Sequence, residues 1–216
     1  MWNLVDKLLA KIKKTITANF AELETLTWGE LTPSLVRDKT KAMYNLLMEN
    51  NRKCLTEIAK KAYDDIVDEL IEMDYVLYRH SAPDGNWVDD YLKSFNRVSQ
   101  YLYYPEADRK RLRLAEEIQT AKEFKDLAML KGSIEKAKGL WWNQTQVYFT
   151  DVVDAVRMEV MSQYADVDMV MWHSEHDERV CQECEERDGR VYTLAAVPKK
   201  HRLCRCWLTP HRISKG

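Results

Sequence analysis

Apolar side chains recur at helical spacing in the first part of the chain. Between residues 2 and 24 seven of them repeat every three or four positions, and lysines occupy other positions of the turn: Leu4, Leu8, Leu9, Ile12, Ile16, Phe20 and Leu23. This period predicts one amphipathic helix. Thr32 followed by Pro33 is typical of a helix N-cap and first turn, and apolar positions continue from there to Ile71 without an intervening Gly. We therefore expect a second, long helix, with Asn50–Asn51 as the place where it would bend.

Three further helices are expected before residue 165. The turn residues Ser81–Gly85 separate the second helix from a third over Trp87–Tyr103, which Pro105 ends. A fourth helix, rich in Arg, Lys and Glu, runs from Pro105 towards Leu130, and its charge indicates that one side faces solvent. The fifth, Ser133–Tyr164, is the most apolar and is expected in the core.

The pattern changes to short strands after the fifth helix. Val167–Trp172 is β-branched and apolar, Arg190–Leu194 follows an Asp-Gly turn, and Leu203–Leu208 is a candidate third strand. The predicted fold is therefore mainly α, with long helices in a body of residues 1–165 and a small α+β module with a basic tail over residues 166–216. A module of about 50 residues buries little apolar surface, so we expect a metal ion or another staple to hold it.

The composition is that of a soluble globular protein. The 216 residues are 45% hydrophobic and 31% charged, which excludes collagen-like, mucin-like and strongly disordered classes. Only 6 Gly and 5 Pro are present, fewer than a chain of many short strands joined by tight turns needs. No run approaches the roughly 18 apolar residues of a membrane span, and charged residues interrupt the start of the chain where a signal peptide has an apolar core. We expect a protein made and kept in a reducing cytosol, with no membrane partner.

The cysteines are clustered, since four of the five lie between Cys181 and Cys206. Cys181 and Cys184 are spaced C-x-x-C, and His201, Cys204 and Cys206 follow after sixteen residues. In a cytosolic chain this spacing is typical of a zinc site, because thiolate and imidazole suit that ion. Five candidates compete for four positions: we expect Cys181, Cys184 and Cys204 to bind, and the fourth position stays open between His201 and Cys206. A shell closed by such ligands makes the zinc structural.

No catalytic residue is predicted. The polar run His173–Asp177 could supply an acid, a base or a metal ligand, but no nucleophile or second motif accompanies it, so we interpret it as a solvated loop. Cys54, alone in a long helix, is interpreted as a small core residue.

Charge is unevenly distributed along the chain. Residues 189–216 carry seven basic and no acidic side chains, whereas the remaining 188 residues carry 26 basic and 35 acidic ones. Such a tail either contacts nucleic acid or an acidic partner, or is solvated or docked on the acidic body, and charge alone does not separate these cases. The side chains offered for contact are Arg190, Lys199, Lys200, Arg202 and Arg205.

The C-terminal motif resembles that of a known family. Five features are similar to the C-terminal signature of the tailed-bacteriophage minor head proteins, the family named for the F head protein of phage Mu: Trp172, Asp177–Cys184, Asp188–Tyr192, Pro198 and His201–Cys206. That signature reads as a Trp, an Asp-x-Arg-x-Cys-x-x-Cys run, a Gly before a short strand and a closing His-Pro-x-Cys-Arg-Cys. Arg202 stands where the family usually has Pro, and the likeness covers about Thr145 to Pro210.

The resemblance implies a structural protein and no enzymatic activity. Members are virion components present in few copies, associated with the portal vertex inside the phage head and sometimes with DNA. We accordingly expect a minor head (capsid) protein made in the host cytoplasm, which docks by its helices on the portal or major capsid protein. It would aid head morphogenesis or DNA packaging and ejection, with its basic tail on DNA. Two alternatives stay open: a metal-dependent nuclease or toxin-like enzyme that uses the His173–Asp177 run, and a zinc-dependent adaptor unrelated to phages.

Overall fold

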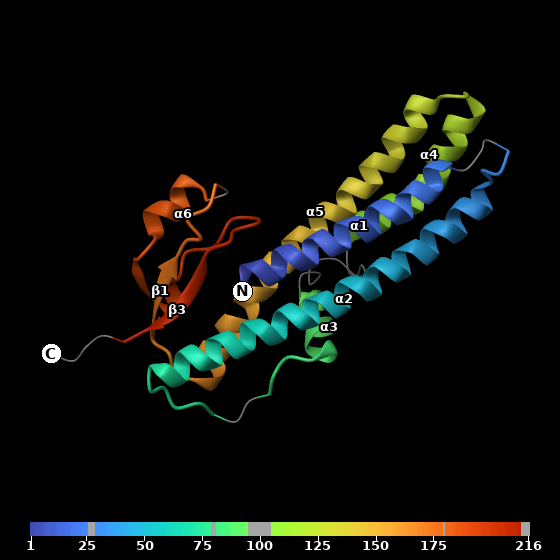
Figure 1. Ribbon diagram of the computed structural model, residues 1–216. Helices are drawn as coiled ribbons and strands as arrows, with labels where there is room; N and C mark the ends of the chain where they lie inside the picture. The colour runs from blue at the N-terminus through green and yellow to red at the C-terminus, as the bar shows by residue number, and fades with distance from the viewer. Residues whose placement is uncertain (26–28, 79–80, 95–104, 179, 213–216) are drawn as a thin grey trace. The chain divides into compact units, whose positions relative to one another are not determined.

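The computed structural model describes residues 1–25, 29–78, 81–94, 105–178 and 180–212, most of which are helical (Figure 1). The elements in chain order are α1 (Trp2–Thr25), α2 (Pro33–Glu72), α3 (Gly85–Ser94), α4 (Pro105–Glu123), α5 (Leu127–Glu159), a π-helical turn (Val160–Tyr164), β1 (Met169–His173), α6 (Gln182–Arg187), β2 (Val191–Thr193), a 3-10 turn (Leu194–Ala196) and β3 (Trp207–His211). The predicted class, mainly α with a small α+β module near the C-terminus, is confirmed. Among the described residues every helix is too short or too polar to span a bilayer.

The first two helices begin and end close to their predicted positions. Thr32 caps α2, because its Oγ1 accepts a hydrogen bond from the Leu35 N–H at 3.2 Å and so satisfies one of the open amides of the first turn. α2 continues through Asn50–Asn51 as one helix. Asn51 is buried, and its Nδ2 donates to Thr145 Oγ1 of α5 at 2.9 Å. A polar pair inside the helical core thus explains an Asn that the sequence pattern marks as an interruption.

The boundary between the fourth and fifth helices was predicted wrongly. α4 ends at Glu123 and α5 begins at Leu127, so the expected break near Leu130 and Ser133 lies inside α5. The chain turns at Lys125, whose φ is 52°, and the next N–H, that of Asp126, donates back to the Ala121 carbonyl at 2.8 Å. The Asp126 Oδ1 then accepts the Met129 N–H at 2.9 Å and caps α5.

The third helix begins close to its predicted start at Trp87. α3 begins at Gly85, where Asp84 Oδ1 accepts the N–H groups of Asn86 and Trp87 at 2.9 Å each. It ends at Ser94, and the remainder of the helix expected up to Tyr103 lies outside the described residues.

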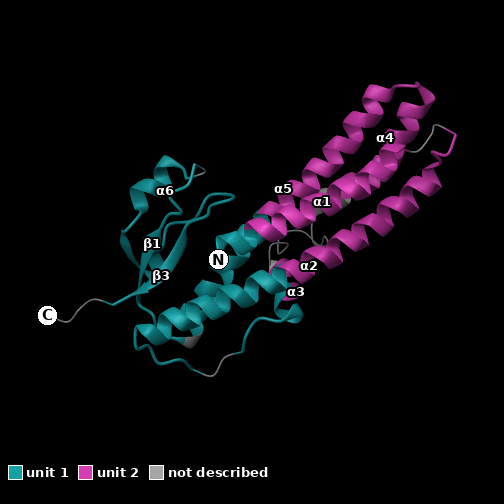
Figure 2. Ribbon diagram, viewed as in Figure 1, with its two compact units in different colours: residues 1–5, 55–88, 147–216 teal, residues 6–54, 89–146 magenta. Residues whose placement is uncertain are grey.

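The chain forms two compact units (Figure 2). Unit 1 contains residues 1–5, 55–88 and 147–216, and unit 2 contains residues 6–54 and 89–146. Unit 2 is helical, and its largest buried side chains include Ile12, Ile16, Phe20, Leu47 and Trp141. Unit 1 holds the sheet and all the predicted metal ligands. The division at residue 165 that the sequence suggests stays a prediction.

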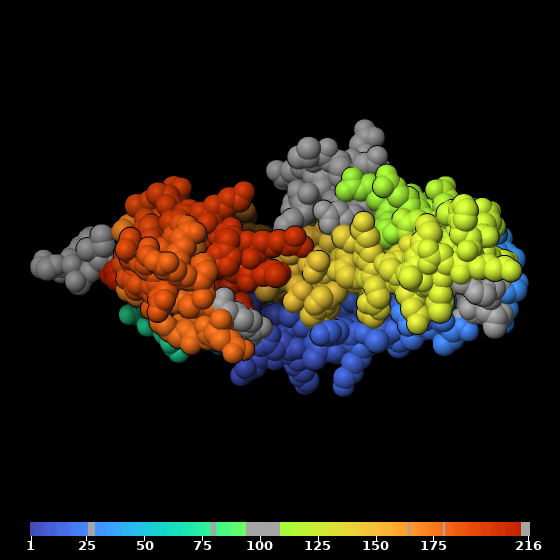
Figure 3. Space-filling view, turned by 90° about the horizontal axis from the view of Figure 1, so that it is seen from above, coloured from blue at the N-terminus to red at the C-terminus, as the bar shows by residue number. Residues whose placement is uncertain are grey.

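The sheet of unit 1 has the order β2-β1-β3, with both pairs antiparallel. Val170, in the centre of β1, lies opposite Tyr192 on one side and Pro210 on the other. The expected third strand, Leu203–Leu208, is displaced: β3 begins only at Trp207. The residues before it form a turn, in which Leu203 has a φ of 62°. Side chains of the C-terminal residues, orange to red in Figure 3, gather in one compact group.

Arg157 of α5 fixes the sheet to the helices of unit 1. Its guanidinium is only 4% exposed, and its Nε donates to the Leu208 carbonyl of β3 at 3.0 Å. The same group is paired with Glu69 of α2. A buried arginine with a carboxylate and a carbonyl partner is satisfied, and this is the condition under which burying its charge is tolerated.

Candidate metal centre

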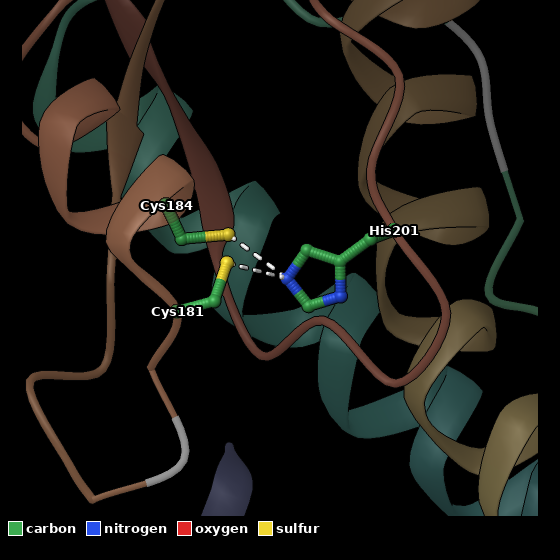
Figure 4. A group of neighbouring side chains, drawn as sticks. All are labelled: Cys181, Cys184 and His201. Carbon is green, nitrogen blue, oxygen red and sulfur yellow. Dashed lines mark hydrogen bonds between the residues drawn. The ribbon is translucent and has the colours of Figure 1, made fainter.

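The first two candidate ligands lie at the start of α6, a helix that the sequence analysis did not predict. Cys181 precedes the helix and Cys184 belongs to its first turn. The N–H groups of Cys184 and Glu185 both donate to the Cys181 carbonyl at 3.0 Å, which closes this turn. A closed turn explains why both sulfur atoms point to the same side, towards His201 (Figure 4).

A second turn presents the other candidates. The Cys204 N–H donates to the His201 carbonyl at 3.2 Å, with Leu203 in the left-handed region. The turn therefore forms with Arg202 at the position where the resembled family has Pro. Lys200 Nζ also donates to the carbonyl of Cys206, so the two ends of the segment 200–206 are held together.

All five predicted ligands meet around Cys184. His201 Nε2 lies 3.1 Å from Cys184 Sγ and 3.3 Å from Cys181 Sγ (Figure 4), and Cys184 Sγ lies 3.6 Å from Cys204 Sγ. The donor atoms form two overlapping groups, Cys181–Cys184–His201 and Cys184–Cys204–Cys206, and within each group they lie within 4.8 Å of one another. Ligand bonds of about 2.0 to 2.3 Å would separate donors by about 3.5 to 3.8 Å in a tetrahedral site. These residues are therefore close enough to bind a metal ion.

The four clustered thiols differ in burial and in hydrogen bonding. Cys184, Cys204 and Cys206 are buried, whereas Cys181 is half-buried. Burial raises the pKa of Cys184 to about 12. A hydrogen bond from the Cys206 thiol lowers the pKa of Cys204 to about 6, and the same bond, together with burial, raises the pKa of Cys206. The hydrogen bond therefore favours the ionised form of Cys204 over that of Cys206.

The orientation of His201 suits a metal ligand. Its Nδ1 lies 2.9 Å from the carbonyl oxygen of Arg202, and because a carbonyl only accepts, Nδ1 carries the proton and donates. This hydrogen bond raises the pKa of His201. In the neutral ring, the lone pair of Nε2 then points at the sulfur atoms of Cys181 and Cys184. Metal-binding histidines commonly have their second nitrogen held in this way.

Two of the five side chains predicted to contact DNA have partners inside unit 1. Lys200 Nζ lies 2.6 Å from Asp154 Oδ2 and 5.3 Å from the ring centroid of Trp172. Arg205 Nε lies 3.4 Å from Asp177 Oδ2, and its side chain is 11% exposed. Three others are exposed on the surface: Arg190, Lys199 and Arg202. Contact with DNA stays a prediction, and it now rests on these three exposed side chains.

Side chains and backbone of the polar run His173–Asp177 have partners within the C-terminal module. His173 Nε2 lies 2.7 Å from Thr209 Oγ1, and burial lowers the pKa of this histidine. His176 Nε2 lies 3.1 Å from Asp188 Oδ2. The N–H of Ser174 donates to Asp188 at 2.7 Å and lowers the pKa of that carboxyl group. Within the described part of the chain, this run contributes no member to the two groups that can hold a metal ion.

Sequence reasoning missed the residue that anchors the second turn. Asp154 of α5 pairs with Lys200, and burial raises the pKa of its carboxyl group while the ammonium lowers it. An acid in the middle of the most apolar helix, after Val152 and Val153 and before Val156, is the signal that could have marked it.

Comparison of the chain with family models, with curated proteins and with solved structures gave no match.

Proposed function

We propose that this chain is a structural minor head protein of a tailed phage, and that one zinc ion holds its C-terminal module together. The observation that carries the proposal is that two groups of donor atoms, Cys181–Cys184–His201 and Cys184–Cys204–Cys206, overlap at Cys184, since the same residues form the motif that resembles the minor head proteins. Three thiolates and an imidazole are a donor set that suits zinc.

The proposed ligands are Cys181, Cys184, Cys204 and His201. His201 takes the fourth position because its Nε2 lies 3.1 and 3.3 Å from two of the sulfur atoms. Cys206 lies outside this set, and its hydrogen bond to Cys204 lowers the pKa of Cys204 and so adjusts the basicity of a ligand. Four protein ligands leave no position for a substrate, so the ion has a structural role.

The zinc ion would keep the C-terminal module of this mainly helical protein folded. The ion joins α6 to the segment 201–206, two stretches that short strands alone hold weakly. In the proposed virion the helices dock on the portal or the major capsid protein, inside the phage head. The exposed Arg190, Lys199 and Arg202 face DNA or an acidic partner.

The test is incorporation into heads. The chain is produced together with the portal and major capsid proteins encoded by the same genome, and purified heads are analysed by quantitative mass spectrometry. We expect the chain in few copies per head, and we expect Cys184→Ser to lose both zinc and incorporation while Cys54→Ser, a buried thiol outside the cluster, keeps both. Heads that never contain the chain would overturn the phage proposal. DNA cleavage that needs a divalent metal and is abolished by His176→Ala would favour the nuclease alternative.

A further inference from the structure

A cavity of about 330 Å³ opens in unit 1 beside the metal centre, and it contains none of the five candidate ligands. Its polar lining consists of Asp151 and Asp154, one turn apart on α5, and of Lys200. The rest of its wall is apolar and comes from α5, from the segment 194–198 and from β3: Met158, Leu194, Val197, Pro198 and Leu208.

The two acids of this cavity differ in their ion pairs. Lys200 is committed to Asp154, whose Oδ2 lies 2.6 Å from its Nζ. The other oxygen of Asp154 is buried and accepts no hydrogen bond from the described residues. Asp151 has no ion pair of its own within 4.0 Å in the described part of the chain, and burial together with the neighbouring Asp154 raises the pKa of its carboxyl group to about 6. Lys200 and Arg202 lower the pKa of Asp151 from a distance, and Lys200 and Arg157 lower that of Asp154, so Asp151 is the acid of the cavity that lacks a close cationic partner among the described residues.

The apolar wall restricts the kind of cation that fits. A hydrated inorganic ion would use the carboxylate and leave five apolar side chains without a contact. A lysine or arginine side chain would use both features, because its methylene groups cover apolar surface while its head carries the charge. The volume is at the lower end of ligand pockets and suits a single side chain.

We propose that this cavity is the binding site for one lysine or arginine side chain of a partner protein, with its charged head on Asp151 and its methylene groups against Met158 and Val197. The site gives a physical basis for recognising a basic segment on the partner. It uses none of the metal ligands, although its Lys200 and Asp154 also hold the segment that presents three of them.

The test is an NMR titration of the full-length ¹⁵N-labelled chain, purified without chelator. The probe is acetyl-Ala-Arg-Ala-amide, and its control is the same peptide with citrulline, which has the shape of arginine without its charge. We expect the arginine peptide to shift the amide signals of residues 151–158 and 194–200 and to bind at least about fivefold more tightly than the citrulline peptide. The lysine peptide is expected to bind at the same site and its norleucine counterpart to fail.

Substitution of Asp151 tests whether its charge is responsible for binding the arginine peptide. Asp151→Asn is expected to remove the preference for arginine over citrulline, whereas Asp168→Asn, at an exposed acid of the same unit outside the cavity, should keep it. Equal binding of the two wild-type peptides would overturn the proposal without any variant. Displacement of the arginine peptide by MgCl₂, with the same signals shifting, would show instead that the two acids hold an inorganic cation.

Discussion

Lys200 Nζ lies 2.6 Å from Oδ2 of Asp154, and these two residues connect the segment that presents three of the candidate ligands to helix α5. Lys200 precedes His201 directly and also donates to the carbonyl of Cys206. These contacts of Lys200 therefore hold both ends of the segment 200–206, which presents His201, Cys204 and Cys206. Such outer contacts orient ligands and affect metal affinity.

Loss of this pair should weaken metal binding. Asp154→Asn removes the charge that holds Lys200 and is expected to lower zinc affinity by about tenfold or more, measured by competition with a chromophoric chelator. Asp151→Asn, at the acid one turn earlier in the same cavity, is the matched control and should leave the affinity unchanged. Equal affinities for both variants and the wild type would mean that Lys200 does not position the centre.

The ligand set can be read from cobalt spectra. With Co²⁺ in place of zinc, the sulfur-to-metal charge-transfer band should correspond to three thiolates. Cys206→Ser is expected to leave that band nearly unchanged, because Cys206 lies outside the proposed ligand set. His201→Ala should lower metal affinity by about a hundredfold, since a ligand is lost. A spectrum of four thiolates that loses intensity in Cys206→Ser would assign the fourth position to Cys206 instead.

Asp151 should make the protein less stable as the pH rises. Burial raises the pKa of this carboxyl group from its ordinary value of 3.8 to about 6, so the folded state favours the protonated form. Between pH 4 and pH 6 the folded state binds more protons than the unfolded state, and stability falls with pH until the group is ionised in both. The free energy of unfolding of Asp151→Asn, relative to that of wild type, should therefore be about 1 kcal/mol higher at pH 7.5 than at pH 5.

Urea unfolding followed by tryptophan fluorescence at the two pH values measures this difference. Both chains are measured with chelator present, so that metal release does not contribute to the difference. A difference between variant and wild type that does not change with pH would contradict a raised pKa at this position.

DNA binding, if the exposed basic side chains carry it, should depend steeply on salt. Replacing Arg190, Lys199 and Arg202 by Gln removes up to three phosphate contacts, and the slope of log affinity against log salt concentration should fall by about 2 to 3. Gln at Lys7, Lys11 and Lys14, which are exposed on α1, serves as the control with the same loss of charge. Binding that is absent at low salt, or that does not depend on salt, would leave an acidic protein as the partner of this surface.

Helix periodicity and cap residues predicted much of the fold, because both are local signals. The Thr32 cap and the long α2 follow from neighbours in sequence, and so does the Asp-Gly turn at Gly189, whose φ is 71°. The end of α4 was missed because Lys125 occupies the left-handed position where Gly is usual. Asp126, which caps α5, is the local signal for the start of that helix.

The candidate site was predictable in its members but not in their surroundings. Ligand spacing identified all five candidates, because two close pairs of soft ligands are a local pattern. The partners of Lys200 and Arg205 were not visible, since Asp154 lies 46 positions earlier and Asp177 sits in a polar run without a marked role. A count of basic residues in the tail therefore overestimated the charge that is free to meet a partner.

Metal analysis of the full-length chain, purified without chelator, tests the zinc centre most directly. We predict one zinc ion per chain, and loss of that ion in Cys184→Ser, where the C-terminal module from Val167 to Pro210 should loosen while α1 to α5 persist in the far-ultraviolet circular dichroism spectrum. Cys54→Ser should retain the ion. A metal content near zero in the wild-type chain, with the C-terminal module still folded, would contradict a structural zinc site.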